Sequence, residues 1–377
     1  MHIEKLSLIG FKNYPQIELD FSNRINCFVG PNGAGKTNLL DAIHYLSMTK
    51  SAFNSVDSQN IRFGEGLFSI KGLFHKNEKT YEVICALQKG QKKIVKVSKK
   101  EYEKLSDHIG MFPVVLIAPD DTDLVRGSSE TRRKFFDVIL SQLDKKYLQH
   151  LIRYNHFLKQ RNALLKQFNQ GLAFDRDLLI PYNTQLLAPG DFLYQRRKEF
   201  VTHFLNDFQK NYAWLAEEAE EVDIIYASDC DSSSFQQQFD QALSKDIALE
   251  RTTLGIHRDD YKFMIQGTPL KKFGSQGQQK TFLLALKLAN YQEVKEHLQS
   301  EPILLLDDIF DKLDSNRIVR LMQKVAENAF GQIFITDARE ERTRSILKEL
   351  NLVAAFYRVK GGQADSIEEH DQKDTRS

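Results

Sequence analysis

The chain has 377 residues, of which 41% are apolar and 27% are charged, and its net charge is +1; this length suits about two domains. The near-neutral charge excludes attraction of a polyanion by overall charge, so nucleic-acid binding requires local basic patches. Three widely spaced cysteines support neither a disulfide framework nor a zinc site, and no apolar run could span a membrane, so we expect a cytoplasmic protein without a membrane partner.

The first 117 residues alternate apolar and polar positions as strands do, and a single helical segment interrupts the pattern. Turn residues separate the alternating segments. We expect strands at residues 3–9, 16–21, 67–74, 81–87 and 93–97.

The interrupting segment begins with GPNGAGKT at residues 30–37, which fits the phosphate-loop pattern GxxxxGK(S/T). An apolar stretch at 24–29 precedes it and a helical pattern follows, so the helix N-terminus would face bound phosphates. The ammonium of Lys36 suits the outer phosphates and the hydroxyl of Thr37 suits Mg²⁺; the alternative is an ordinary glycine-rich turn. The predicted nucleotide contacts are Gly30, Pro31, Asn32, Gly33, Ala34, Gly35, Lys36, Thr37 and Asn38.

Helical periodicity dominates from about 128 to 245, with breaks expected at Gly171, Pro181 and Pro189–Gly190. After residue 254 we expect strands again, a helix over 278–298, a strand at 303–306, another helix and a strand at 332–336. The polar end lacks periodicity. The predicted domains are a head from 1–122 and 250–362, a helical insertion at 123–249 and a flexible tail at 363–377.

The strand at 303–306 ends in two carboxylates. Asp307 is the candidate for holding Mg²⁺ together with Thr37, and Asp308 is the candidate base for the attacking water. The alternative is a buried strand whose acidic end caps a turn. The predicted catalytic set is Lys36, Ser275, Asp307 and Asp308.

The segment FGSQGQQK at 273–280 places Ser275, Gly277 and Gln278 just before a helix. Alone it suggests a polar helix cap. Between the phosphate loop and the acidic strand, it resembles the signature loop of ABC-type ATPases. That resemblance implies ATP and Mg²⁺ as cofactors and an ATP-dependent homodimer, in which the signature loop of one protomer closes over the triphosphate of the other.

Two further segments fit the same resemblance. DKLD at 311–314 resembles the D-loop that lines the dimer interface, and APDD at 118–121 is the counterpart of the Q-loop. Thr336 lies where transporters place a switch histidine, so the sensor of the γ-phosphate stays unassigned.

Within this superfamily the N-terminal segment LSLIGFKNY and the run NGAGKTNLLDAI resemble the RecF family and its SMC-like relatives. The segments at 118–137, 154–165 and 274–289 and GIHRDD at 255–260 narrow the resemblance to RecF, although Ile256 replaces the usual proline. The resemblance implies an α/β ABC-type head with an inserted helical lobe. It also implies a slow, weak ATPase of DNA repair, replication and the SOS response that binds DNA and acts with RecO and RecR to load RecA at single-stranded gaps.

Two groups of basic residues are candidates for DNA phosphates, although lysines also protect sheet edges from aggregation. Arg126 and His257 have ordinary structural alternatives, a surface charge and a hydrogen-bonded turn. The candidate groups are Lys89, Lys92, Lys93, Lys96, Lys99 and Lys100, and Arg132, Arg133, Lys134, Arg153, Lys159, Arg161 and Lys166.

The alternative functions are the ATP-binding subunit of a membrane transporter and a coiled-coil chromosome protein. The sequence lacks the switch histidine of transporter subunits and contains a basic helical insertion, and both features argue against a transporter subunit. Glycine and proline breaks in the insertion predict short helices, which speak against a long coiled-coil arm.

Overall fold

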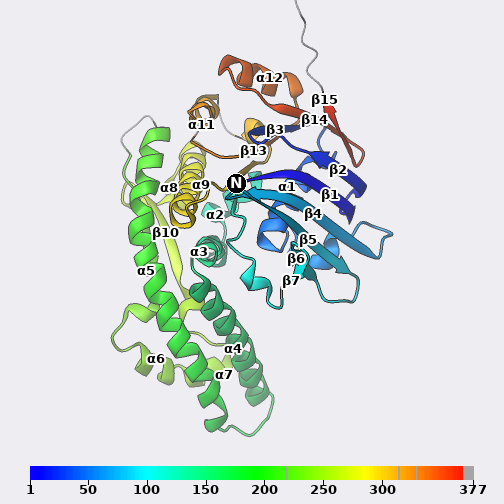
Figure 1. Ribbon diagram of the computed structural model, residues 1–377. Helices are drawn as coiled ribbons and strands as arrows, with labels where there is room; N and C mark the ends of the chain where they lie inside the picture. The colour runs from blue at the N-terminus through cyan, green and yellow to red at the C-terminus, as the bar shows by residue number, and fades with distance from the viewer. Residues whose placement is uncertain (217–219, 313–314, 328, 368–377) are drawn as a thin grey trace, which may run out of the picture. The chain divides into compact units, whose positions relative to one another are not determined.

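The computed structural model describes residues 1–216, 220–312, 315–327 and 329–367, and the chain divides into two compact units (Figure 1). Unit 1 comprises Met1–Pro119 and Val294–Ser377, and unit 2 comprises Asp120–Glu293. Helix α9, Gln276–Leu298, passes from unit 2 into unit 1. No helix among the described residues combines the length and apolar character that crossing a membrane requires.

An antiparallel sheet of six strands forms the N-terminal part of unit 1, in the order β2-β1-β4-β5-β6-β7. Its strands alternate buried and exposed residues, which confirms the strand predictions for this region. The strands are β1 (His2–Phe11), β2 (Tyr14–Asp20), β4 (Leu67–Lys76), β5 (Lys79–Gln88), β6 (Ile94–Val97) and β7 (Lys100–Glu101).

A second, mixed sheet of unit 1 has the order β15-β14-β3-β13-β12-β8, in which the five strands from β14 to β8 are parallel. Strands β3, β12 and β13 are buried along their whole length, as expected for a sheet covered on both faces. The strands are β3 (Ile25–Val29), β8 (Val114–Ile117), β12 (Ile303–Leu306), β13 (Ile333–Asp337), β14 (Ala355–Lys360) and β15 (Gln363–Ile367).

Strand β15 corrects the prediction of a flexible tail from residue 363. Gly361 and Gly362 have φ of 58° and 77°, so they form the tight turn that folds β15 back onto β14. The glycine pair was a readable hairpin signal. The rest of the predicted tail, 368–377, lies outside the described residues.

Helix α1, Lys36–Met48, contacts strands of both sheets of unit 1, and its buried face carries Leu39, Leu40 and Ile43. The remaining helices of this unit lie in the connections between strands. They are η1 (Asp57–Asn60), η2 (Leu105–Asp107), η3 (Pro119–Thr122, reaching unit 2), α10 (Ile309–Lys312), α11 (Ser315–Ala326) and α12 (Glu340–Glu349).

Unit 2 is mostly helical, as predicted, but one expected break is wrong. Helix α5 runs from Ile180 to Ala216 and continues through Pro189 and Gly190, both of which are buried. A Cβ on Gly190 would lie 3.4 Å from the ring of Tyr154 in α4, so the small residue allows the two long helices to approach. The helices are therefore longer than the sequence suggested.

Unit 2 also contains a small sheet with the strand order β11-β10-β9. Residues 250–293, which the sequence analysis grouped with the head, pack in this unit because β10 pairs with β9. The elements are α2 (Asp123–Arg126), α3 (Ser129–Leu143), α4 (Lys145–Asn169), η4 (Asp177–Leu179), β9 (Val222–Ala227), η5 (Asp229–Asp231), α6 (Phe235–Gln241), α7 (Leu243–Ala248), η6 (Ile256–Arg258), β10 (Asp260–Ile265), β11 (Thr268–Pro269) and α8 (Leu270–Phe273).

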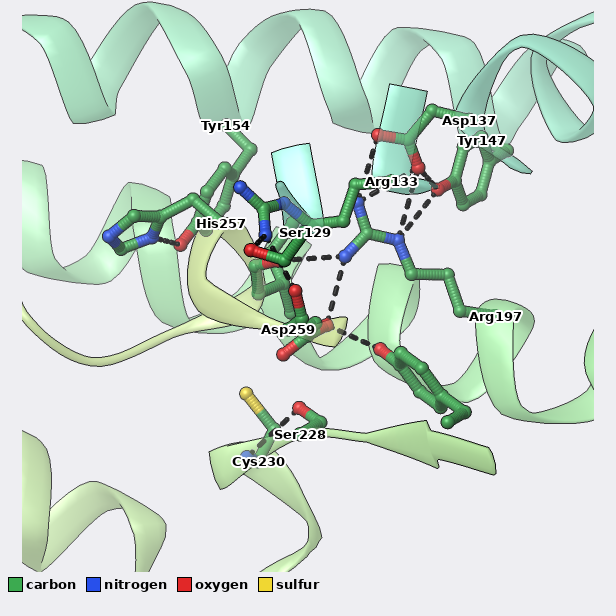
Figure 2. A network of polar contacts seen from close by, with 12 residues as sticks. Ser129, Arg133, Asp137, Tyr147, Tyr154, Arg197, Ser228, Cys230, His257 and Asp259 are labelled. Atoms are coloured by element: carbon green, nitrogen blue, oxygen red, sulfur yellow. Dashed lines mark hydrogen bonds and ion pairs between the residues drawn. The ribbon is translucent and has the colours of Figure 1, made fainter. Parts of the chain in front are cut away.

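A buried polar network joins the GIHRDD segment to three helices of unit 2 (Figure 2). The guanidinium of Arg197, 1% exposed, binds Asp259 at 2.9 Å and Asp137 at 2.8 Å. His257 accepts a hydrogen bond from Tyr154 at Nδ1 and donates from Nε2 to the carbonyl of Thr252. These contacts match the structural alternative for His257, and burial lowers its pKa to about 4.

The buried imidazole makes the stability of unit 2 depend on pH. Because the pKa of His257 is about 4 in the folded chain and 6.5 when unperturbed, its contribution is complete above pH 6.5 and decreases as the pH falls toward 4. We expect the free energy of unfolding to drop by about 3 kcal/mol between pH 7 and pH 4 on this account. His257→Gln removes that part of the pH dependence, measured by urea unfolding with the fluorescence of Trp214.

His203, an exposed histidine of α5, gives the matched control. His203→Gln should leave the pH dependence of the urea midpoint unchanged. Equal pH slopes for the parent chain and His257→Gln would show that His257 is not held neutral by burial.

Candidate nucleotide-binding site

The phosphate loop connects β3 to α1 at the carboxyl end of the parallel strands of unit 1. Because β12 and β13 run parallel to β3, their last residues and the residues that follow them arrive at the same edge. A pocket of about 320 Å³ opens there, lined by Asn32, Gly33, Gly35, Lys36, Thr37, Asn38, Pro119, Asp307, Asp308 and Thr336. The sheet thus brings together Thr37 and Asp307, which are 270 residues apart in the chain.

Two glycines of the loop have backbone conformations that disfavour a side chain. Gly30 has φ of 152°, and a Cβ there would lie 2.2 Å from the carbonyl oxygen of Val359. Gly35 has φ of 114° and precedes α1 without a side-chain cap, so its amide and the following ones stay available to an anion.

Lys36 lies folded against its own loop. Its ammonium donates to the carbonyl oxygens of Gly30 at 2.7 Å and Pro31 at 3.0 Å. Burial lowers the pKa of Lys36, while Asp307, Asp308 and neighbouring carboxylates act in the opposite direction. The lysine is therefore a buried cation that faces an acidic wall, a suitable partner for phosphate oxygens.

Asp307, 4% exposed, follows β12 and contacts both the first turn of α1 and the end of β13. Its carboxylate accepts hydrogen bonds from the Thr37 hydroxyl at 2.9 and 3.0 Å and from the Thr336 hydroxyl at 2.7 Å. The amide of Asp308 donates to the same Thr336 oxygen at 2.8 Å. The two predicted metal ligands, Thr37 and Asp307, are thus in direct contact, and Thr336 is a positioning residue that the sequence left without a role.

Asp308 occupies a strained position beside this bridge. Its φ is 48°, and its Oδ1 is buried with no hydrogen-bond partner among the described residues. Burial, followed by the charges of Asp311 and Asp307, raises the pKa of Asp308. Arg342 partly balances the acidic cluster, because it pairs with Asp311 at 2.6 Å and with Asp337.

Three consecutive residues where β1 turns into β2 contact the phosphate loop or the helix after it, and sequence reasoning missed them. The Asn13 amide donates to the carbonyl of Ala34 at 3.0 Å and accepts from Asn38 at 2.7 Å. The Tyr14 hydroxyl donates to the carbonyl of Gly35 at 3.0 Å. Lys12 pairs with the buried Asp41 of α1 at 2.6 Å. The segment KNY was part of a family resemblance but carried no spacing signal for these contacts.

The signature-like loop belongs to unit 2. The Ser275 hydroxyl accepts from the amide of Gln278 at 3.2 Å, and the Gln278 side chain accepts from the amide of Ser275 at 2.7 Å. This reciprocal pair is a capping box at the start of α9, as the helix-cap alternative predicted. Ser275 and Gln276 are exposed, so the cap leaves the helix N-terminus accessible to an anion.

Several predicted DNA contacts are used inside the protein instead. Arg161 is fully buried and pairs with Asp246, and Arg132 pairs with Asp260. Arg133 donates to the carbonyl of Asp259, and Lys93 pairs with Asp57. Arg126 binds Gln279, an ordinary structural contact. The candidates that remain exposed are Lys89, Lys92, Lys99 and Lys100 on the β5–β7 edge, and Lys134, Arg153, Lys159 and Lys166 on α3 and α4.

The counterparts of the Q-loop and the D-loop both make contacts, and the second is described only in part. In the Q-loop counterpart at 118–121, Pro119 lines the pocket, and Asp121 pairs with Lys287 at 2.6 Å. In the D-loop counterpart at 311–314, Asp311 pairs with Arg342, whereas Leu313 and Asp314 lie outside the described residues.

Comparison with known proteins gives concordant matches. The family described as the RecF/RecN/SMC N-terminal domain matches residues 2–360. The chain is 50% identical to the DNA replication and repair protein RecF of Cytophaga hutchinsonii, over 91% of both chains, and 47% identical to that of Flavobacterium johnsoniae, over 95% of this chain and 100% of that one. A solved structure described as the recombination mediator protein RecF–ATP in the RecFOR pathway superposes with a TM-score of 0.89 at 26% identity, covering 97% of this chain and 98% of that one.

The Asn13 contacts predict a measurable effect on nucleotide affinity. Asn13→Asp keeps the side-chain shape but replaces the donor to the Ala34 carbonyl with a repelling oxygen. We expect ATP affinity to fall about tenfold, equivalent to about 1.4 kcal/mol, by isothermal titration. Gln16→Glu adds the same charge at an exposed position of β2 and should leave affinity unchanged; equal affinities for all three chains would remove Asn13 from the site.

Proposed function

The chain belongs to the RecF family of DNA replication and repair proteins, and from that premise we propose that it is an ATP-dependent DNA-binding protein with weak ATPase activity. It would act in recombinational repair and the SOS response, promoting RecA loading at single-stranded gaps together with RecO and RecR. The family excludes the transporter alternative. The observation that carries the proposal is the bridge from Thr37 through Asp307 to Thr336 beside the phosphate loop.

ATP is the proposed ligand of the pocket at the end of β3. Lys36 and the loop amides would bind its phosphates, in support of which a structural relative is described with ATP. The donor set also fits Mg²⁺, because the hydroxyl of Thr37 and the carboxylate of Asp307 are hard oxygen ligands already in contact at 2.9 Å. When bound, the ion would neutralise charge on the phosphates.

We expect the side chains around the pocket to support slow hydrolysis of ATP. Asp308 lines the pocket, and we assign it the role of base for an attacking water. Thr336 fixes the backbone of Asp308 and orients Asp307. Lys36 would leave its two carbonyl partners to bind phosphate, so nucleotide binding includes a rearrangement of the loop.

Dimerisation is the proposed consequence of ATP binding. The N-terminus of α9 is exposed. There the hydroxyl of Ser275 and the amide of Gly277 could donate hydrogen bonds to the γ-phosphate of ATP bound to a second protomer. Two ATP molecules would thereby join two protomers, and hydrolysis would release them. Paired protomers would also combine their exposed lysines into one larger basic surface for gapped or duplex DNA.

Replacement of the proposed base should separate ATP-dependent dimerisation from ATP hydrolysis. Asp308→Asn should keep ATP-dependent dimerisation but lower the hydrolysis rate about 100-fold, because the proton acceptor is lost. Lys36→Ala should lose both properties, since phosphate binding fails. Sedimentation with ATP, with ADP and without nucleotide measures the first property, and phosphate release measures the second.

The exposed residue Asp107 supplies the control for this pair, and Asp107→Asn should behave like the parent chain. Normal turnover by Asp308→Asn contradicts its role as base. Single protomers under saturating Mg·ATP and DNA contradict the dimer.

Lys99 and Lys100, on the β5–β7 edge, should contribute to DNA affinity through contacts with phosphates alone. Lys99→Gln and Lys100→Gln should each weaken duplex binding severalfold, regardless of sequence, and reduce the slope of log affinity against log salt by about one. Lys210→Gln, at an exposed lysine of α5 paired with Asp207, is the control. An unchanged salt slope in both variants would place DNA elsewhere.

A further inference from the structure

Strand β9 is an open edge of the small sheet in unit 2. Among the described strands it pairs only with β10. Side chains satisfy part of its outer edge, since Gln209 donates to the carbonyl of Val222 at 2.8 Å and Asp223 accepts from the amide of Ile224 at 2.7 Å. The two-residue period of a strand then directs the amide and carbonyl of Tyr226 to the same outer edge. Such an edge can pair with another extended chain.

A pocket of about 260 Å³ lies between this strand and helix α5. Its apolar wall comes from Tyr194, Val201 and Leu205 of α5 and from Ile224 of β9. At the rim the ammonium of Lys198 pairs with Asp231 at 2.8 Å, and Asp231 also accepts from the Tyr194 hydroxyl. The volume suits one aliphatic side chain that enters beside the strand edge.

The segment that forms this edge is acidic, whereas the neighbouring strand β10 carries the exposed Lys262 opposite Ile225. Residues 220–231 contain five carboxylates and no lysine, arginine or histidine. The one lysine that lines the pocket, Lys198, is already paired with Asp231, and Asp229 is exposed. Phosphate groups would be repelled here, whereas a chain carrying lysine or arginine would be attracted.

We propose that the β9 edge and its pocket bind an extended basic segment of a partner protein. The segment adds a strand to β9 through the backbone of Tyr226, inserts an aliphatic side chain between Leu205 and Ile224, and places its cations near Asp229 and Asp231. Backbone pairing supplies affinity, and the pocket and the carboxylates supply specificity. This surface shares no lining residue with the nucleotide pocket, so the proposal does not rest on ATP binding.

The test uses the full-length chain and a seven-residue peptide that alternates lysine or arginine with valine or leucine. We expect the peptide to slow amide hydrogen exchange in the segment 222–227 at least threefold, as read by mass spectrometry. A peptide with glutamate in place of the basic residues should have no effect. Thr202, an exposed residue that lines the pocket, provides the variant: Thr202→Trp fills the space and should weaken peptide binding about tenfold.

Thr202→Ser keeps the hydroxyl that donates to the carbonyl of Lys198 and should bind like the parent chain. Asp229→Lys, at an exposed site, should weaken binding about fivefold and keeps the test decisive if Thr202→Trp does not fold. Equal binding of the acidic peptide, or no change of exchange at 222–227 with the basic peptide, overturns the proposal. Slowed exchange at 222–227 with duplex DNA would assign the surface to nucleic acid and overturn it as well.

Discussion

The carboxylate of Asp307 is the point on which the site depends. It accepts from Thr37 of the phosphate loop and from Thr336 of β13, while its own chain continues β12. One side chain that is almost completely buried therefore ties the ends of β12 and β13 to the start of α1. A buried carboxylate without such partners would be costly, so the two hydroxyls both stabilise the charge and fix its direction. The same direction suits a divalent cation.

The elements around this point hold the backbone where the chemistry needs it. The β1–β2 turn fastens the phosphate loop through Asn13 and Tyr14, and Lys12 fastens the helix that follows through Asp41. The antiparallel sheet thus positions a loop that belongs to the other sheet. The exposed lysines at the β5–β7 edge belong to the same antiparallel sheet as this turn.

Unit 2 distributes its charges differently. Arg161 and Arg197 are buried with carboxylate partners and hold the long helices and the GIHRDD segment together. Buried pairs of this kind favour one arrangement of the unit over others because a separated charge would lose its partner in a poorly solvated place. The surface then carries exposed cations on α4 and carboxylates next to β9, which are suited to different classes of partner.

The sequence by itself determined the phosphate loop, the acidic strand end, the strands of the first sheet and the family, because each has a local pattern of glycine, charge or alternation. Tertiary structure decided which cations are free, since the partners of Arg132 and Arg161 lie 128 and 85 residues away. It also decided the roles of Asn13 and Thr336, and the continuation of α5 through Pro189, where close packing outweighs a local break signal. Local patterns record the conformation of a segment, whereas contacts between distant segments depend on the register of strands and the packing of helices, which no short pattern encodes.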